Sequence, residues 1–355
     1  MKLFDAHCHL QDPRILNKAP KLISTALDSG LLNFAVNGVS EKDWHLVKEM
    51  GDNYPSVIPC FGVHPWYVPQ RSPNWFTTLK EFFETTPAAA VGEIGLDKGS
   101  KGREIDFNDQ IEVFRQQLEL AKELKKPASV HCVRAFDDLL HIVKYDFLYI
   151  YLKPSKSLAL ITISVFARSA HYQAYALVNV CVSLLQCINI LRDIGPFPDG
   201  LLLHSYLGSA EMVPEFVKSG AYFSLSGYIM PMKVQKAKKM LKTIPLERIL
   251  LESDAPDALP HLELSSLFLV DEDPSLPQEI FAHGRTAASN VSTSSDTSRD
   301  ASSLRKDMLN HPANIHNVLD YVANLLEISK EELAEISYKN SIRLFSYQGS
   351  KVALG

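Results

Sequence analysis

Residues able to bind a metal ion recur along this chain of 355 residues, at or beside the ends of short apolar segments. Five of the 12 histidines belong to this pattern. Imidazole nitrogens and carboxylate oxygens together suit Zn, Mn, Fe or Mg, and no thiolate is needed among the ligands. The pattern predicts a metal site assembled from residues far apart in sequence. Its members are His7, His9, Asn37, His64, Glu93, His131, His204 and Asp254.

The spacing indicates how two ions can be held. His7 and His9 stand two residues apart where a strand ends, so both imidazoles can bind one cation. A carboxylate such as Glu93 can bridge two ions, and His131 and His204 can complete a second site.

Each of these residues also has an ordinary structural explanation. An H-x-H pair arises by chance, and His64 can be a turn residue before Pro65. Glu93 can be an interior carboxylate paired with a lysine, and Asp254 can cap a helix. Their joint occurrence at successive strand ends favours the metal site over these separate explanations.

Eight apolar segments have the composition of strands buried on both faces of a parallel sheet. Eight β/α units in about 250 residues are typical of a (β/α)8 TIM barrel, whose chemistry lies at the C-terminal ends of its strands. A doubly wound sheet is the competing arrangement. The expected strands are 2–7, 31–37, 57–63, 88–95, 127–132, 200–206, 221–226 and 248–254.

Helical periodicity separates many of these strands. Apolar residues recur every three or four positions over 105–124, which predicts one buried helix face. Ser72 and Pro73 are expected to cap a helix that starts there, with the proline at its first position. Further helices are predicted at 231–243, 314–327 and 330–346.

The overall composition is that of an ordinary globular protein, with 46% hydrophobic and 22% charged residues and a net charge of −5. The five cysteines form an odd set without C-x-x-C spacing, so neither a zinc ribbon nor a disulfide framework is indicated. The first residues do not resemble a secretory signal. We therefore expect a reducing compartment, the cytoplasm, with the nucleus as the alternative.

Two stretches differ from the rest. Residues 145–190 hold 30 apolar residues among 46, four charges and no glycine, and 169–191 carry no charge. Polar residues interrupt 169–191, and a membrane span inside a closed barrel is topologically implausible, so we interpret 145–190 as an insertion between β/α units. Residues 261–304 are rich in serine and acids, the composition of a flexible loop. The expected organisation is one barrel over 1–348 with two insertions.

Seven segments together resemble the TatD family of metal-dependent deoxyribonucleases, within the amidohydrolase-like metallohydrolase superfamily. The resemblance covers 1–144 and 191–348 and agrees in order and spacing. An Asn-x-Pro-like segment, NHPANI at 310–315, is also similar. The seven segments are DAHCHL, FGVHP, VGEIGLD, VHCVRA, LHSYLGS, LLESDAP and YKNSIRLF.

The resemblance implies two divalent cations, of which Mg, Mn and Zn are the candidates. One is held by His7, His9, Glu93 and Asp254, and the other by Glu93, His131 and His204. It also implies that His64 lies by the scissile phosphate as a ligand or proton carrier. Ser205, Gly208 and Ser209 would lie in a loop near the substrate.

Two departures affect substrate contacts. The family arginine two residues after the fifth-strand histidine is replaced by Val133, with Arg134 one place later, and the usual aromatic after ESDAP is Asp257. Local cations favour phosphate binding on the side where the strands end; the alternative is that these lysines form a solvated helix face, which is common. They are Lys98, Lys101 and Arg103 after the fourth strand and Lys233, Lys236, Lys238 and Lys239 after the seventh. Trp66 and Tyr67 can stack on a base or pack within their loop.

The expected function is hydrolysis of DNA phosphodiesters, as an exonuclease, by a two-metal activated-water mechanism. Asp254 is the expected base, and His64 and Glu93 are the other catalytic residues. Arg134 and Lys233 join the substrate-binding candidates. DNA is the expected transient partner, with no membrane and no obligate protein partner. Two alternatives remain: a small-molecule metallohydrolase of the amidohydrolase type, and a variant impaired by the insertion at 145–190.

Overall fold

A computed structural model describes residues 1–146, 197–271 and 308–352. The expected insertion at 145–190 and the expected loop at 261–304 lie outside the described residues, apart from 145–146 and 261–271. Across the part of the chain that is described, no helix is long and apolar enough to cross a membrane. The uncharged segment at 169–191 lies outside the described residues, so this statement does not cover it.

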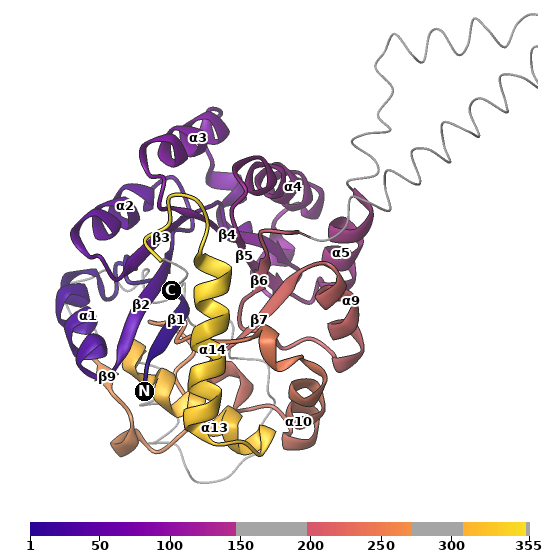
Figure 1. The fold of residues 1–355 in the computed structure, drawn as a ribbon. Coiled ribbons are helices and arrows are strands. Elements are labelled where there is room, and N and C mark those ends of the chain that lie inside the picture. The colour runs from indigo at the N-terminus through magenta and orange to yellow at the C-terminus, as the bar shows by residue number, and fades with distance from the viewer. Residues whose placement is uncertain (147–196, 272–307, 353–355) are drawn as a thin grey trace, which may run out of the picture.

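Eight parallel strands follow one another around a single sheet in chain order, each paired with the next (Figure 1). The sheet closes where the ends of the first and last strands meet, because the Asp254 N–H donates to the His7 carbonyl at 3.0 Å and the His9 N–H to the Ala255 carbonyl at 2.7 Å. A doubly wound sheet would reverse its strand order, so the (β/α)8 barrel is confirmed. The strands are β1 Leu3–Cys8, β2 Leu31–Asn37, β3 Val57–Phe61, β4 Ala90–Asp97, β5 Ala128–Val133, β6 Leu201–Leu203, β7 Ala221–Leu225 and β8 Ile249–Leu251.

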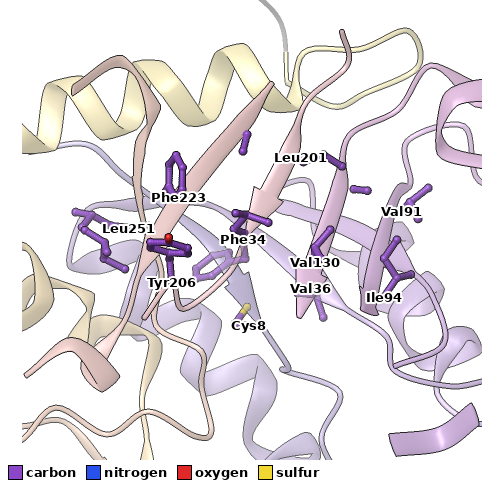
Figure 2. Close-up of a cluster of buried hydrophobic side chains, with 14 of the residues drawn as sticks. Cys8, Phe34, Val36, Val91, Ile94, Val130, Leu201, Tyr206, Phe223 and Leu251 are labelled. Carbon is purple, nitrogen blue, oxygen red and sulfur yellow. The ribbon is translucent and has the colours of Figure 1, made fainter. Parts of the chain in front are cut away.

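Helices surround the strands on the outside (Figure 1). Apolar side chains from several strands, such as Phe34, Val130 and Phe223, form the buried cluster against which these helices pack (Figure 2). A short antiparallel pair, β9 Leu269–Val270 and β10 Leu309–Asn310, lies beyond β8. The helices are α1 Ala19–Asp28, α2 Trp44–Asn53, α3 Trp75–Thr85, α4 Phe107–Leu124, α5 Phe136–His141, α9 Val213–Lys218, α10 Val234–Thr243, α13 Ile315–Leu326 and α14 Lys330–Phe345.

The C-terminal helix α14 closes the end of the barrel where the strands begin. Its Leu344 and Phe345 pack with inward-facing residues near the strand starts, and the Phe345 ring stacks on Phe4 with centroids 5.0 Å apart. Because α14 fills this end, the other end, where the strands finish, is the open one.

The expected cap of the third helix is wrong. The helix α3 begins at Trp75 with Asn74 at the N-cap, so Pro73 lies outside it. Ser72 is used elsewhere, because its N–H and its hydroxyl both donate to the Glu41 carboxylate at 2.7 Å. The other expected helices agree with α4, α10, α13 and α14 to within three residues at each end.

Candidate metal centre

Seven predicted side chains from β1, β3, β4, β5, β6 and β8 meet at the open end of the barrel. Their ligand atoms form three overlapping groups, within each of which the atoms lie no more than 4.8 Å apart. The groups are His7, His204 and Asp254; His7, His9 and Glu93; and His64, Glu93 and His131.

Glu93 stands at the centre of this cluster, and its two carboxylate oxygens face different partners. The Oε2 atom lies 3.5 Å from His7 Nε2 and 3.3 Å from His9 Nε2. The Oε1 atom lies 2.9 Å from His204 Nε2, 3.0 Å from His131 Nδ1 and 3.5 Å from His64 Nε2. A carboxylate in this position can serve two ions at once, one on each oxygen.

The first side of Glu93 is completed by Asp254. Its Oδ1 lies 3.6 Å from His9 Nε2 and 3.8 Å from His7 Nε2, and the two imidazole nitrogens are 3.1 Å apart. Asp254 adopts a left-handed backbone conformation, φ 51°, three residues after the end of β8. Within 255–271 nothing longer than a 3-10 turn follows it, so helix capping does not explain this residue.

The outer nitrogen of each ligand histidine faces an acceptor. His9 Nδ1 lies 2.8 Å from the Asn37 carbonyl, which can only accept, so this nitrogen carries the proton and Nε2 keeps its lone pair. His131 Nε2 lies 3.2 Å from Asp97 Oδ2, and His204 Nδ1 lies 3.7 Å from Glu252 Oε1. His131 can thus present its inner nitrogen as a metal ligand in the same way, whereas His204 Nδ1 has no hydrogen-bond partner among the described residues and makes only this longer contact with Glu252.

His64 has the opposite arrangement. Its Nδ1 accepts the backbone N–H of Trp66 at 3.1 Å, so the proton of the neutral ring sits on Nε2, the nitrogen that faces Glu93. In this state His64 points a donor, and not a lone pair, into the cluster. Its geometry suits a proton carrier or a hydrogen-bond donor better than a ligand.

Burial and opposite charges shift the pKa values of the cluster. Burial lowers the pKa of His7 to about 4, and it also holds the pKa of His64 well below its usual value. Burial opposes charge on Glu93 and on His204, but the surrounding histidines hold the pKa of Glu93 well below its usual range. Glu93 and Glu252 likewise raise the pKa of His204. Burial also raises the pKa of Asp254.

The donor set fits divalent cations. Two imidazole lone pairs 3.1 Å apart, at His7 and His9, repel each other unless a cation or proton lies beside them, and two carboxylates border the same space. All ligand atoms are nitrogen or oxygen, which suits Mg, Mn or Zn without thiolate. The arrangement also contradicts the alternative for Glu93, because histidines and no lysine surround it among the described residues.

The cluster opens into a cavity of about 740 Å³. The predicted substrate residues Ser205, Gly208, Ser209 and Arg134 line it, whereas Lys233 stands exposed at the N-cap of α10 and is not in the described lining. The Ser205 N–H and hydroxyl both donate to Glu252, at 2.7 and 2.6 Å, so this serine also supports the partner of His204.

Several expected cations are already paired. Lys98 donates to Asp138 at 2.7 Å, and Lys238 and Lys239 form ion pairs with Glu327 and Glu211, as on a solvated helix face. On another wall of the cavity, the Arg14 guanidinium donates to two carboxylates, Asp12 and Asp257, each at 2.9 Å. Asp257, which replaces the family aromatic, is thus bound by Arg14.

Sequence reasoning missed the acceptors behind the ligands. Asp97 is four residues after Glu93 and Glu252 is two before Asp254. Even spacing along an extended strand places side chains on one face, so this was the available signal. Ser129, whose hydroxyl is 2.8 Å from His7 Nδ1, is likewise two residues before His131.

Comparisons with known proteins identify the family and the fold of this chain. A family model described as TatD related DNase matches residues 4–150 and 162–346. The chain is 24% identical over 343 residues to the uncharacterized metal-dependent hydrolase YabD of Bacillus subtilis, covering 97% of this chain and 98% of that protein. It is 23% identical over 260 residues to the 3'-5' ssDNA/RNA exonuclease TatD of Erwinia billingiae, covering 73% and 80%. The crystal structure of the TatD homolog YjjV of Escherichia coli has a TM-score of 0.66 at 20% identity, covering 97% and 98%.

Proposed function

The chain belongs to the family of TatD-related DNases, and from this premise we propose that it removes nucleotides from DNA ends as a two-metal exonuclease. As a member of this family it is a metal-dependent hydrolase that acts on ester bonds. The name of the Erwinia relative, a 3'-5' ssDNA/RNA exonuclease, supports cleavage from an end.

One observation carries the proposal: the two oxygens of Glu93 face two separate groups of ligand atoms. From the contacts of the two oxygens we assign one divalent cation to His7, His9, Glu93 and Asp254, and another to Glu93, His131 and His204. Mg, Mn and Zn are the candidate ions. When bound, such a pair of ions neutralises charge on the phosphate and activates water for attack.

The protein's own groups handle the protons. Asp254, at the edge of the first ligand group, is the proposed base that takes the proton of the attacking water. His64 presents its Nε2–H to the cluster and is placed to donate to a phosphoryl or leaving oxygen. Ser205, Gly208, Ser209 and Arg134 are proposed to contact the DNA strand in the cavity. The same role for Lys233 requires the substrate to extend to α10.

The decisive variant is Glu93→Ala. We expect metal-dependent cleavage of labelled single- and double-stranded DNA to fall by about 10³-fold or more, because both ions lose a shared ligand. Metal analysis of the same preparation should show fewer bound ions per chain. Glu104→Ala, at an exposed acidic residue beyond the same strand, is the matched control and should cleave normally. Full activity of Glu93→Ala would overturn the assignment.

A small-molecule metallohydrolase is the second candidate, favoured by the carboxylates of Asp12 and Asp257 in the cavity wall. A salt titration separates the two. Binding of DNA should weaken steeply as salt rises, because counterions are released from the phosphates, whereas a small neutral substrate should be insensitive.

We propose one barrel domain over 1–348, interrupted at 145–190 and 261–304. Deletion of 145–190 tests whether the first interruption impairs the enzyme. Higher solubility or nuclease activity of the shortened chain would support impairment, and equal behaviour of both forms would refute it. The free thiols of Cys8, Cys60 and Cys132 support a reducing compartment, the cytoplasm or the nucleus.

A further inference from the structure

The loop that follows β4 is folded tightly back on the end of that strand. A Cβ added at Gly102 would lie 2.2 Å from the Asp97 carbonyl oxygen, so only glycine allows this approach. The buried Gln110 of α4 holds the two ends of this loop together, because its Nε2 donates to the carbonyls of Asp97 at 3.2 Å and of Gly102 at 2.9 Å. Lys101, the residue directly before the second anchor, is therefore held in the wall of the cavity that contains the metal-ligand cluster.

Lys101 lines the cavity, and its ammonium has no hydrogen-bond partner among the described residues although it is buried. The Nζ atom lies 4.2 Å from the centroid of the Trp66 ring and 5.9 Å from that of Tyr67. The neighbouring Lys98 differs, because its ammonium is paired with Asp138. Lys101 is thus the cation of this loop whose donors are both buried and unused, whereas Arg103 is exposed to solvent.

The ring beneath Lys101 is fixed to the catalytic cluster. The Trp66 indole N–H donates to Asp97 Oδ2 at 2.6 Å, and the same oxygen lies 3.2 Å from His131 Nε2. A chain of contacts thus joins the lysine to a metal ligand through one tryptophan and one carboxylate.

A buried ammonium without an acceptor is costly, and a cation–π contact offsets only part of that cost. Burial lowers the pKa of Lys101, opposed by the carboxylates of Asp97, Asp257 and Glu104. None of these carboxylates accepts a hydrogen bond from Nζ. An anion entering the cavity would supply the missing acceptor, and the flexible four-carbon stem allows the ammonium to reach it.

We propose that Lys101 is a phosphate-binding residue of the substrate cleft, whose ammonium, supported by the Trp66 ring, pairs with an anionic oxygen of a substrate phosphate next to the metal centre. The proposal rests on the proposed action on DNA. It places Trp66 under the lysine, and so assigns this ring to holding a cation in place of stacking on a base.

The test measures affinity and its dependence on salt. A fluorescent phosphorothioate oligonucleotide, which resists cleavage, is titrated against the metal-loaded full chain. We expect Lys101→Met to weaken binding about tenfold, the size expected for one charge-assisted hydrogen bond. The slope of log affinity against log salt should fall by about 0.7 to 1, as for one lost phosphate contact. KM for cleavable DNA should rise in parallel, with a smaller change in kcat.

Two further variants control this result. Lys98→Met removes an adjacent lysine that is already ion-paired and should retain wild-type affinity and salt slope. Lys101→Arg keeps both the charge and the contact with Trp66, and should retain most of the wild-type affinity. This result would attribute the loss in Lys101→Met to the missing charge and not to a perturbed loop.

Oligonucleotides with one neutral methylphosphonate linkage locate the contact. When the contacted linkage is made neutral, binding to the wild-type chain should weaken about tenfold, whereas binding to Lys101→Met should not weaken further. The effects of the protein variant and of the DNA modification would then be fully coupled in a double-mutant cycle. If the wild-type chain cleaves DNA but Lys101→Met binds it with unchanged affinity and an unchanged salt slope, the role of Lys101 is overturned. Failure of the wild-type chain to bind or cleave DNA with any divalent ion would overturn the proposed function itself.

Discussion

Each histidine ring at the metal centre has two nitrogens with different roles, and the role is set by the group behind the ring. Asn37, Asp97 and Glu252 lie behind His9, His131 and His204. At His9 and His131 the acceptor is within hydrogen-bond distance, so it fixes the proton on the outer nitrogen, orients the ring and makes the inner nitrogen a stronger ligand, whereas Glu252 lies 3.7 Å from His204 Nδ1. At His64 the Trp66 N–H takes the place of the acceptor, and the ring presents a donor to the cluster.

Asp97→Asn tests this role of the outer groups. We expect metal affinity to fall about 10- to 100-fold, because the neutral amide holds the outer proton of His131 less strongly and the ring loses its orientation. Isothermal titration with Mn²⁺ or Zn²⁺ measures the change. Asp106→Asn, which keeps an acceptor for the Asn108 N–H at the N-cap of α4, is the control and should bind metal like the wild type. Unchanged affinity in Asp97→Asn would contradict the assignment.

Among the elements, α4 acts as a support for two strand ends. Its buried Gln117 exchanges two hydrogen bonds with the backbone of Val63, and Gln110 does the same for Asp97. The apolar periodicity predicted the helix, but these two glutamines share its buried face. They form hydrogen bonds with the N–H and carbonyl groups of Val63, just beyond β3, and of Asp97, at the end of β4. Buried backbone groups at such strand ends need partners from outside the sheet.

Gln110→Leu should therefore destabilise the protein by about 1 to 3 kcal/mol, because the Asp97 N–H is left buried without an acceptor. Urea unfolding measures the loss. Gln116→Leu, six residues further along the same helix and bonded among the described residues to the exposed Glu112, should change the free energy of unfolding by less than about 0.5 kcal/mol. Equal losses in both variants would show that the buried bonds contribute nothing specific.

The turn before α13 predicts a pH dependence. His311 Nδ1 accepts the Ala313 N–H at 2.9 Å, and burial lowers its pKa to about 4 from the usual 6.5. The unfolded chain binds this proton more readily, so stability is complete above pH 6.5 and is lost as the pH falls towards 4. The contribution is about 2 kcal/mol after allowance for partial exposure.

In His311→Asn the side-chain oxygen can still accept the Ala313 N–H, but the side chain cannot be protonated. Chemical unfolding of both proteins in EDTA, at pH values from 7.5 to 4, isolates the effect as a difference between them. We expect the variant to lose less stability than the wild type across this range. Parallel curves would exclude His311 as the source.

At the scale of the whole molecule, the proposed metal centre joins the first and the last strand of the barrel. His7 and His9 belong to the beginning of the chain and Asp254 follows the last strand, so an ion held between them ties the seam between β1 and β8. The opposite end of the barrel is filled by α14 and has no such need.

Metal removal should accordingly lower the melting temperature. An ion at 100 times its Kd stabilises the folded state by about 2.7 kcal/mol, which corresponds to several degrees. Differential scanning calorimetry with EDTA, and after readdition of Mn²⁺, measures the shift. In Glu93→Ala the shift should be small, because the shared ligand is missing; a shift of wild-type size there would contradict a centre built on Glu93.

The sequence by itself determined the strand order, because eight apolar segments alternate with helices and can be read without knowing their partners. It also pointed to the proposed ligands, since each lies within a strand or no more than three residues after one, and barrel strands all finish at one mouth. Only the tertiary structure decided what each nitrogen faces. The pairs His131–Asp97, His204–Glu252 and Lys101–Trp66 join residues 34, 48 and 35 positions apart, so their geometry depends on packing between elements and not on local spacing.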